Sequence, residues 1–222
     1  MASLAEGRLD LMPADRIHLI RHGEVHNPDA VIYGRLPHFA LSERGHKMAE
    51  AAAAELKAEG RKISALYVSP LLRTRESAEP VQKTFGLEPK IDDRLVEPYN
   101  VFEGRRLGFG HVLARPHLYY HLRNPLQPSW GEPFREIASR MLEVIEEAWQ
   151  NTQDGDVVLV SHQLPIEMVH RSLTGMSLPH NPRNRRTALS SITTLERQGN
   201  KFVEVGYRDP SAALRAVDRG AV

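Results

Sequence analysis

The sequence DVVLVSH, residues 156–162, decides the fold. Four consecutive apolar residues, 157–160, separate Asp156 from the polar pair Ser161-His162. A run without polar alternation is typical of a strand that is buried on both faces, as in the interior of a parallel sheet. Parallel strands are joined by crossover helices, so helices are expected before and after this run. The stretch therefore predicts an α/β fold.

Strand-like and helix-like segments alternate on both sides of this run. Strands are expected at 17–21 and 63–70, and helices at 42–60, 71–86, 134–151 and 164–175. Ser42 is a candidate N-cap and Gly60 a candidate stop for the first helix. Two β-rich runs around Gly199 close the chain and predict a hairpin at a sheet edge.

Two of the expected helices carry distinct apolar patterns. Segment 134–151 has one apolar stripe opposite its charged residues, at Phe134, Ile137, Met141, Ile145 and Ala148. Segment 71–86 has a weaker apolar face, at Leu72, Ala78, Val81 and Phe85. Pro80 is expected to kink that helix, because proline has no N–H to donate to the preceding turn.

The whole chain, 1–222, is expected to form one domain, a three-layer α/β/α sandwich around a mostly parallel central sheet. Its core spans about 16–207, with tails at 1–14 and 209–222. Segment 102–133 interrupts the alternation and is rich in Arg, His, Tyr and Pro. We interpret this segment as a cap inserted over one end of the sheet.

The composition excludes several classes of function. The 222 residues include 41% hydrophobic residues and no cysteine, and the formal net charge is +1. This charge balance argues against nucleic-acid or membrane-surface partners, and the lack of thiols excludes disulfides and thiolate chemistry. No apolar run has the length of a signal peptide or membrane span, so a cytoplasmic location is expected. The sequence leaves a monomer and a homodimer open.

Three of the expected strands lead into reactive residues: Arg21-His22, Arg73 in the first turn of the following helix, and His162. Ligands of open α/β sheets bind beyond the carboxyl ends of the strands, so these side chains are expected to converge. Guanidinium forks match phosphate oxygens, and a neutral imidazole can attack phosphorus. In this scheme His22 is the nucleophile, both arginines hold the phosphoryl oxygens, and His162 stabilises their growing charge.

Such a reaction also needs an acid, because the leaving alkoxide must take up a proton. A carboxyl group with a raised pKa at the mouth of the pocket would supply it. Glu97 is the best-placed candidate, and Glu103 and Glu24 are its competitors.

Four motifs resemble those of the histidine phosphatase superfamily, which has the phosphoglycerate mutase-like fold. They occur in the order and approximate spacing of that family: LIRHGE (19–24), YVSPLLRTRESA (67–78), LVEPYNVFEG (95–104) and VLVSHQ (158–163). The resemblance extends over about 17–195. It implies a phosphohistidine intermediate, with no metal and no organic cofactor.

The resemblance also implies roles for single residues. The matched catalytic positions are His22 as nucleophile, Arg21, Arg73 and His162 as the rest of the phosphate pocket, and Glu97 as proton donor. The matched substrate-binding positions are Asn27, Tyr33, Gly34 and Gln163. Asn27 is one residue closer to His22 than in many members, and Gln163 stands where many have glycine, which alters the pocket near the leaving group.

Two departures from the family pattern bear on the activity. Mutases usually follow their acid with arginine-histidine-tyrosine-glycine, whereas Glu97 is followed here by Pro98-Tyr99-Asn100, which favours a phosphatase. The usual glycine-glutamate-serine before the long helix is replaced by Gly131-Glu132-Pro133. This change removes a hydroxyl group from the rim of the expected site.

Simpler interpretations stay open for several of these residues. Arg73 could pair with Glu76 within one helix, Glu97 could be a surface carboxylate, and Tyr33-Gly34 could be an ordinary turn. The expected function is a metal-independent phosphatase for a small-molecule phosphomonoester. Phosphoglycerate mutase-type transfer and a noncatalytic module that binds phosphorylated ligands are the alternatives.

The remaining basic and histidine-rich stretches have weaker signals. His117 and His121 have the i, i+4 spacing of helical metal ligands, but no third ligand accompanies them and no metal site is expected. The basic loop 179–186 is interpreted as a solvated loop, with a second phosphate or a nucleic acid as the alternative. Arg105 and Arg106 are better placed to contact the substrate.

Overall fold

The computed structural model describes residues 13–106 and 131–214, and the statements below concern those residues. The strands are β1 (Arg16–Arg21), β2 (Ile63–Val68), β3 (Pro89–Ile91), β4 (Asp156–Ser161), β5 (Ile192–Gln198) and β6 (Lys201–Arg208). The α-helices are α1 (Glu43–Ala58), α2 (Leu72–Phe85), α4 (Phe134–Gln150) and α5 (Gln163–Leu173). Short 3-10 helices are η1 (Asp93–Leu95), η3 (Pro182–Asn184) and η4 (Ala212–Leu214). Each predicted helix and strand is present close to its expected bounds.

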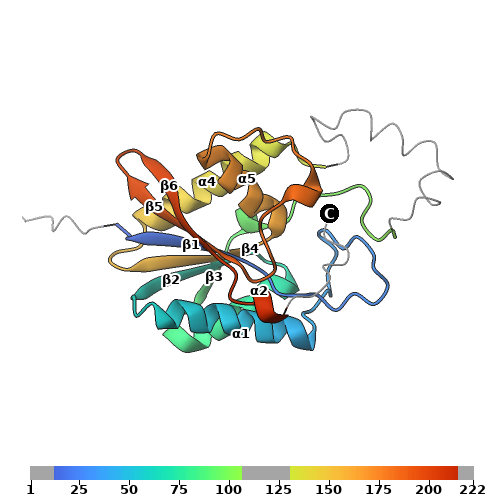
Figure 1. Cartoon of the computed structure of the whole chain (residues 1–222), viewed down its shortest axis with the longest axis horizontal. Helices are drawn as coiled ribbons and strands as arrows, with labels where there is room; N and C mark the ends of the chain where they lie inside the picture. The colour runs from blue at the N-terminus through green and yellow to red at the C-terminus, as the bar shows by residue number, and fades with distance from the viewer. Residues whose placement is uncertain (1–12, 107–130, 215–222) are drawn as a thin grey trace, which may run out of the picture.

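The strands form one six-stranded sheet in the order β3-β2-β4-β1-β5-β6. The first four of these strands pair in parallel, and β5 pairs antiparallel with both β1 and β6. Strand β4 lies between β2 and β1, and all six of its residues are buried. The closing hairpin forms one edge of the sheet, as predicted (Figure 1).

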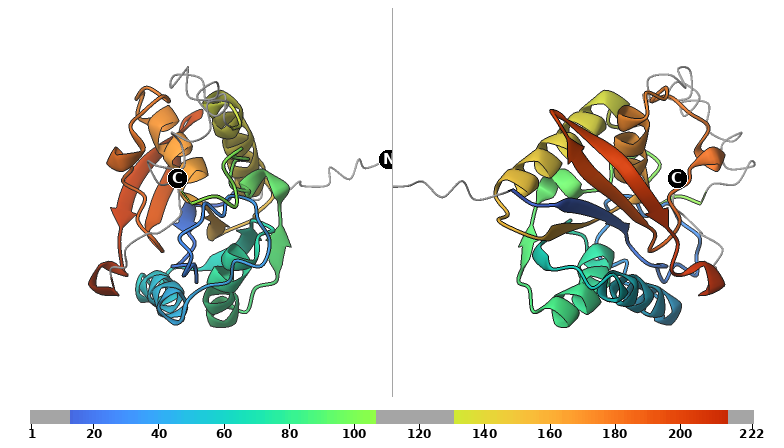
Figure 2. Two further views of the ribbon diagram at one scale, coloured as in Figure 1. Left: turned by 90° about the vertical axis from the view of Figure 1, so that its right-hand side faces the viewer. Right: turned by 60° about the vertical axis from the view of Figure 1, so that its left-hand side comes forward.

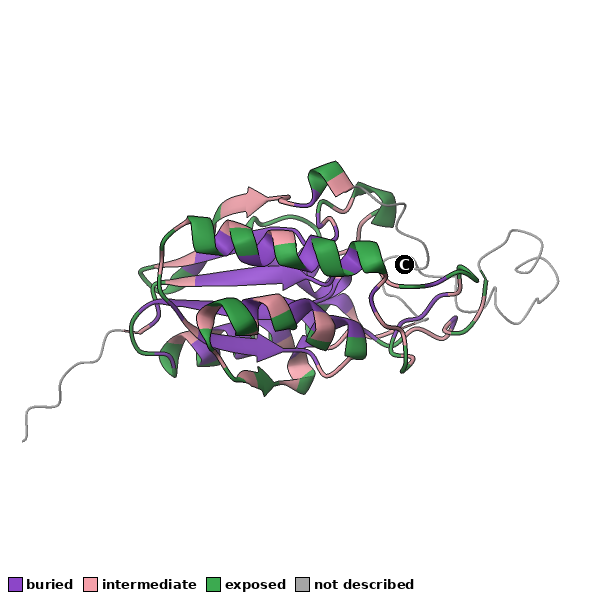
Figure 3. Cartoon of the chain, turned by 90° about the horizontal axis from the view of Figure 1, so that it is seen from below, coloured by how far each residue is buried: buried purple, intermediate pink, exposed green. Residues whose placement is uncertain are grey.

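Helices cover both faces of the sheet. Figure 1 shows α1 and α2 on one side and α4 and α5 on the other. Each pair packs on its own apolar cluster, around Leu56 and Val158 on one side and around Met141 and Leu159 on the other. The view from below shows exposed residues on the outer surface of α1 and α2 and buried strands behind them (Figure 3). The predicted three-layer α/β/α sandwich is confirmed. No helix in the described part of the chain is both long and apolar enough to cross a membrane.

The two clearest helix predictions are confirmed in their details. Ser42 caps α1, because its Oγ accepts a hydrogen bond from the backbone N–H of Gly45 at 3.0 Å. Gly60 follows the helix with a φ of +67°, a conformation that glycine adopts without strain. In α4 every residue of the predicted apolar stripe is buried.

The apolar face predicted for α2 is wrong at its first residue. Leu72 is 38% exposed, while the buried residues of the first turns are Arg73, Thr74 and Ser77. The start of α2 lies beside the polar carboxyl ends of the strands rather than over the apolar core, so polar side chains point inward there. Pro80 lies inside α2, which runs unbroken from Leu72 to Phe85.

Most of the predicted cap, 102–133, lies outside the described residues, and so do His117 and His121. The segments that lead into and out of this part of the chain meet. Asn100 and Gly131 form an isolated antiparallel bridge. The chain is therefore at neighbouring positions before and after the segment 101–130.

The described parts of the two predicted tails pack onto the domain. Ala14 is buried, and Ala14 N donates to Trp149 O at 3.1 Å. Ser211 is also buried, and its Oγ donates to Leu189 O at 2.7 Å. The core is therefore slightly longer at both ends than its predicted bounds.

A buried polar network lies at the opposite end of β4 from Ser161. Asp156 is fully buried and accepts hydrogen bonds from Arg61 at 2.6 and 2.8 Å. A ring nitrogen of His18 lies 3.1 Å from the same carboxylate, and its other ring nitrogen lies 3.0 Å from Thr194 Oγ1. These contacts tie β4 to β1, to β5 and to Arg61, two positions before β2.

We expect Asp156→Asn to destabilise the protein by about 2 kcal/mol at pH 7, because it removes a buried acceptor of charge-assisted hydrogen bonds. Burial alone would raise the pKa of Asp156, but the hydrogen bonds from Arg61 and His18 lower it from 3.8 to about 2. A carboxyl group with a lowered pKa stabilises the fold above its unfolded-state pKa. The stability difference between wild type and variant should therefore shrink as the pH falls from 3.8 to about 2.

Urea unfolding across this pH range measures that difference. The matched control is Asp154→Asn, because Asp154 is 76% exposed and pairs with the exposed Lys62. The control should change the free energy of unfolding by less than about 0.5 kcal/mol, as is usual for surface ion pairs. Equal effects of the two substitutions at pH 7 would contradict a structural role for the Asp156 network.

Candidate active site

The carboxyl ends of β1, β4 and β2 lie side by side, as their pairing requires. His22 follows β1 and donates its backbone N–H to Ser161 O at 3.1 Å. Ser69 follows β2 and donates its backbone N–H to Val160 O at 3.0 Å. Figure 2, left, looks onto this end of the sheet, where the connecting loops gather. The structure thus brings together the three strand ends that the sequence marked as reactive.

His22 is 98% buried with one ring nitrogen held by the backbone. Its relative exposure is 2%, and Nδ1 lies 2.8 Å from Gly23 O. A carbonyl oxygen only accepts hydrogen bonds, so Nδ1 carries the proton and Nε2 presents its lone pair. Burial, together with the charges of Arg73 and Arg21, lowers the pKa of His22 well below 6.5. The imidazole is therefore neutral near pH 7, the state a nitrogen nucleophile needs.

His162 stands next to His22, with a centroid distance of 5.2 Å between the two rings. It is fully buried, and one of its ring nitrogens lies 2.8 Å from Ser69 Oγ. The other ring nitrogen has no hydrogen-bond partner in the described part of the chain and lies 3.7 Å from Glu97 Oε2. Burial, then the charge of Arg73, lowers the pKa of His162 well below 6.5. A buried ring nitrogen without a partner leaves room for a ligand atom.

Arg73 places a guanidinium group beside these rings. It is 1% exposed, its carbon Cζ lies 4.8 Å from the centre of the Tyr33 ring, and Nη2 donates to Gly34 O at 2.7 Å. Among the residues that the structure describes, Arg73 forms no ion pair within 4.0 Å. The pair between Arg73 and Glu76 that the sequence left open is not formed. Glu76 instead accepts a hydrogen bond from Leu41 N at 2.6 Å. A buried cation without a carboxylate partner is costly and favours an anionic ligand.

The Tyr33-Gly34 turn has a definite role in holding Arg73. Gly34 has a φ of +36°, which disfavours other residues. A Cβ atom at this position would collide with the carboxylate of Glu103. Glycine is therefore favoured in the turn that directs the Gly34 carbonyl oxygen to Arg73.

Arg21 is held from the other side of the site, by the loop between α5 and β5. It is 1% exposed, and Nη1 donates to Thr187 O at 2.8 Å. The same carbonyl accepts from Gln163 Nε2 at 3.3 Å. Gln163 Oε1 in turn accepts from Arg185 Nη1 at 3.2 Å. Gln163 thus connects the basic loop with the end of β1.

Glu97 lies beside His162, although it does not follow a strand. It comes after the 3-10 helix η1, and its side chain is 16% exposed. Arg35 Nε donates to Glu97 O at 2.6 Å and fixes the backbone at this position. Burial raises the pKa of Glu97 above 4.5, against the opposing charges of Arg73 and Arg185. The group is therefore suited to carry a proton at higher pH than an ordinary carboxyl group.

The two competing carboxylates are engaged elsewhere. Glu24 Oε1 accepts from Ser42 Oγ at 2.7 Å, beside the N-cap of α1. Glu103 Oε1 accepts from the backbone N–H groups of Arg35 and Asn100, at 3.0 and 3.1 Å. Both glutamates therefore hold local structure, and Glu97 is the carboxyl group beside the second histidine.

Asn27 makes local backbone contacts. Its Nδ2 donates to Val31 O at 2.9 Å, and its Oδ1 accepts from Val31 N at 3.2 Å. These bonds close the loop that precedes Tyr33. A contact between Asn27 and substrate stays a prediction.

Sequence reasoning missed three groups that position the site. They are the Ser69 hydroxyl, which is hydrogen-bonded to His162, the Thr187 carbonyl, which accepts from Arg21, and the Arg185 guanidinium, which donates to Gln163. The signal for Ser69 was present, since it ends a predicted strand next to the strand that ends at His162. Thr187 acts through its backbone, which no side-chain pattern reveals.

The assembled groups can bind a dianion and transfer its phosphoryl group. Two buried guanidinium groups supply positive charge, His22 supplies an unprotonated nitrogen, and Glu97 supplies a proton. In the described part of the chain no three or more His, Asp or Glu side chains cluster as a metal site would require.

Residues 17–210 match the family model described as the histidine phosphatase superfamily, branch 1. The chain belongs to the histidine phosphatase superfamily. It is 44% identical over 203 residues to the uncharacterized protein Rv0525 of Mycobacterium tuberculosis, a match that covers 90% of this chain and 100% of that protein. It is 31% identical over 151 residues to a 2,3-bisphosphoglycerate-dependent phosphoglycerate mutase of Thermoplasma acidophilum, covering 67% of this chain and 70% of the mutase.

The fold of this histidine phosphatase agrees with solved structures. Bacillus stearothermophilus YhfR superposes with a TM-score of 0.73 at 23% identity, covering 94% of this chain and 98% of the other. The superfamily and these relatives identify the chain as an enzyme of the phosphatase or mutase type. The predicted phosphoglycerate mutase-like fold is confirmed.

Proposed function

We propose that this protein is a phosphomonoester hydrolase that acts through a phosphohistidine at His22. One observation carries the proposal: His22 is a buried, neutral imidazole with Nε2 unprotonated, and the charges of the buried Arg73 and Arg21 act on it. Arg73 has no carboxylate within ion-pair distance in the described part of the chain. A phosphoryl dianion would supply the missing negative charge to this site.

In the first half-reaction, His22 Nε2 attacks phosphorus and the bond from phosphorus to the ester oxygen breaks. Arg21, Arg73 and the unpartnered ring nitrogen of His162 bind the phosphoryl oxygens as their negative charge increases. Glu97 donates its proton to the departing alkoxide, which leaves as an alcohol. The products are phosphorylated His22 and ionised Glu97.

In the second half-reaction, water attacks the phosphoryl group and the bond between nitrogen and phosphorus breaks. Ionised Glu97 takes the proton from the attacking water, which restores the carboxyl group. Phosphate leaves and His22 returns to its neutral state. No metal ion takes part in this scheme, since arginine and histidine side chains supply all the positive charge and hydrogen bonds.

Hydrolysis rather than mutase activity is favoured by the residues after Glu97. They are Pro98, Tyr99 and Asn100 in place of the arginine-histidine-tyrosine-glycine stretch of the mutases. Tyr99 is 52% exposed, and Asn100 Oδ1 accepts from Phe102 N in a local turn. The relatives include Phosphoserine phosphatase 1 of Hydrogenobacter thermophilus, at 28% identity over 174 residues.

The test is phosphate release from a panel of phosphomonoesters, including sugar phosphates, nucleotides, phosphorylated hydroxy acids and phosphopeptides, with and without excess EDTA. We expect turnover of at least one class, unchanged by EDTA. Isomerisation of 3-phosphoglycerate with a bisphosphorylated primer, without net hydrolysis, would instead indicate a mutase. Stoichiometric binding without an acid-labile phosphoenzyme would indicate a binding module and contradict the proposal.

A further inference from the structure

The loop between α5 and β5 carries three arginines in three different environments. Arg183 is exposed. Arg186 donates to Glu204 at 2.6 Å, and its Cζ lies 4.3 Å from the centre of the Tyr207 ring. Arg185 instead turns inward. The predicted solvated loop is therefore wrong at Arg185, because this side chain packs against the domain rather than extending into water.

Among the described residues, Arg185 donates only to neutral acceptors. Its Nη1 donates to Gln163 Oε1 at 3.2 Å, and its Nε donates to His180 Nε2 at 3.0 Å. No carboxylate of the described residues lies within ion-pair distance of Arg185. Burial lowers the pKa of Arg185, against the opposing charge of Glu97, although guanidinium stays protonated. A partly buried cation without a direct counter-ion among the described residues is available to an anion.

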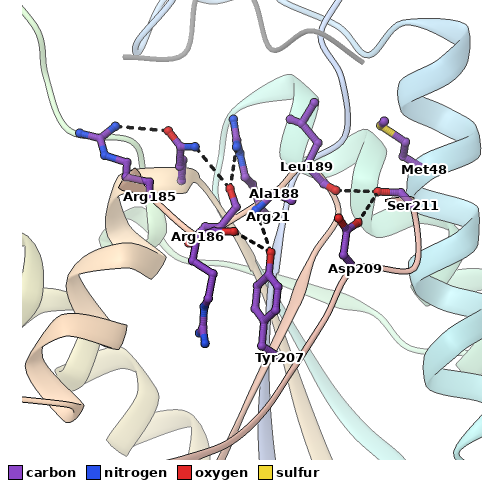
Figure 4. Close-up of a pocket in the computed structure, with 11 residues that line it drawn as sticks. Arg21, Met48, Arg185, Arg186, Ala188, Leu189, Tyr207, Asp209 and Ser211 are labelled. Carbon is purple, nitrogen blue, oxygen red and sulfur yellow. Dashed lines mark hydrogen bonds between the residues drawn. The ribbon is translucent and has the colours of Figure 1, made fainter. Parts of the chain in front are cut away.

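A cavity of about 500 Å³ lies against this side chain (Figure 4). Its lining includes Arg21, Gln163, Arg185 and Thr187 on the side of the catalytic centre, and Met48 and Tyr207 farther away. The lining does not include His22, His162 or Glu97. A group bound here would touch the phosphate-binding arginine but not the nucleophile. It would therefore be held rather than hydrolysed.

The charge of the cavity favours an anion. Three arginines and one carboxylate, Asp209, line it. Arg186 is paired with Glu204, and Asp209 keeps its negative charge. Arg185 has no carboxylate of the described residues within ion-pair distance, so its charge favours an anion at its end of the cavity.

A short series of hydrogen bonds links Arg185 with the catalytic centre. Arg185 donates to Gln163, Gln163 donates to the Thr187 carbonyl, and Arg21 donates to the same carbonyl. Gln163 also directly follows His162 in sequence. Arg185 and Arg21 thus line the same cavity and are joined through Gln163 and the Thr187 carbonyl.

We propose that Arg185 and Gln163 form a subsite for a second anionic group of the substrate, a carboxylate or a second phosphate on its alcohol part. This inference rests on the proposed function, because it assigns the class of phosphomonoester that the same site accepts. The guanidinium of Arg185 binds the anion, and the Gln163 amide holds that guanidinium in position. The enzyme would then prefer anionic esters to neutral ones of equal size.

The test compares pairs of esters that differ in one group. 3-Phosphoglycerate and glycerol 3-phosphate differ in a carboxylate that replaces a hydroxymethyl group, and glycerol 1,3-bisphosphate adds a second phosphate. For Arg185→Gln we expect kcat/KM to fall about 10- to 100-fold for the anionic ester that the enzyme prefers, the usual cost of losing a charged hydrogen bond. The value for glycerol 3-phosphate should change less than about threefold. The affected ester identifies carboxylate or phosphate as the anion.

The matched control is Arg183→Gln, which removes the same charge from an exposed position of the same loop. It should leave all three kcat/KM values unchanged, and Arg185→Lys should recover part of the preference because it restores a cation. An equal loss for all esters in Arg185→Gln would show that Arg185 acts on Glu97 or on the loop, and would overturn the subsite. Unchanged kinetics for all esters would overturn it as well.

A binding measurement on a protein without the nucleophile tests the subsite independently of the proposed hydrolysis. Calorimetry on the His22→Ala protein, with and without Arg185→Gln, measures ester affinity without turnover. Tighter binding of an anionic ester than of glycerol 3-phosphate, lost on removal of Arg185, supports the subsite even if no hydrolysis is found. Equal affinity for all three esters would overturn the subsite even if hydrolysis of simple esters is efficient.

Discussion

His22→Ala should lower kcat for the best phosphomonoester by about 10⁴-fold or more, because it removes the atom that accepts the phosphoryl group. Neither ring nitrogen of His162 is placed to replace it, because in the proposed scheme one binds a phosphoryl oxygen and the other lies 2.8 Å from Ser69 Oγ. Acid-quench trapping with labelled substrate should detect an acid-labile phosphoenzyme in wild type and none in the variant.

Restoring activity to the His22→Ala protein with added imidazole would show that the lost activity is due to the missing nucleophile. The substitution opens a space at a 2% exposed position, where free imidazole is expected to accept the phosphoryl group. Added imidazole should therefore raise the rate of the variant but not of wild type. His46→Ala, at an exposed position of α1, is the matched control and should keep full activity. Wild-type turnover by folded His22→Ala would contradict the covalent mechanism.

The fold could be predicted because its strongest signals are local. The uninterrupted apolar run of β4 indicated a buried parallel strand, and the stripe on α4 indicated the helix that covers it. The convergence of His22, His162 and Arg73 then followed from one topological rule, that parallel strands present their carboxyl ends at one edge. Local patterns together with that rule were sufficient for the architecture and for the residues at the strand ends.

The supporting groups could not be predicted, because they depend on long-range contacts. Ser69 and His162 are 93 positions apart, and Arg21 and Thr187 are 166 apart. The inward turn of Arg185 depends on Gln163 and His180, and nothing in the basic loop distinguishes it from Arg183. Leu72 is an apolar residue that its helical spacing predicts to be buried. It is exposed because the start of α2 lies beside the catalytic centre and not over the core.

Glu97→Gln should reduce kcat/KM by about 10²- to 10³-fold for an alkyl ester such as glycerol 3-phosphate, the usual contribution of a general acid. The alkoxide of such an ester cannot leave without a proton. For p-nitrophenyl phosphate the leaving group is stable as an anion, so the rate of the initial nitrophenolate burst should fall less than about tenfold. Glutamine keeps the size of the side chain, so the difference between the two esters isolates proton donation.

The pH dependence of kcat/KM is an independent test of Glu97 as the acid and His22 as the nucleophile. Burial lowers the pKa of His22 well below 6.5, so the loss of activity toward acid, as His22 gains a proton, should occur below pH 6.5. Burial raises the pKa of Glu97 above 4.5, so the loss toward alkali, as Glu97 loses its proton, should occur above pH 4.5. Glu97→Gln should abolish the alkaline loss and leave the acid one.

Glu24→Gln is the matched control for both measurements, because Glu24 is held by Ser42 and Arg44 at the start of α1. It should keep the wild-type difference between esters and the wild-type pH profile. If Glu97→Gln kept full activity on glycerol 3-phosphate, the proton would have to come from another group. That result would contradict the assignment of Glu97 as the general acid.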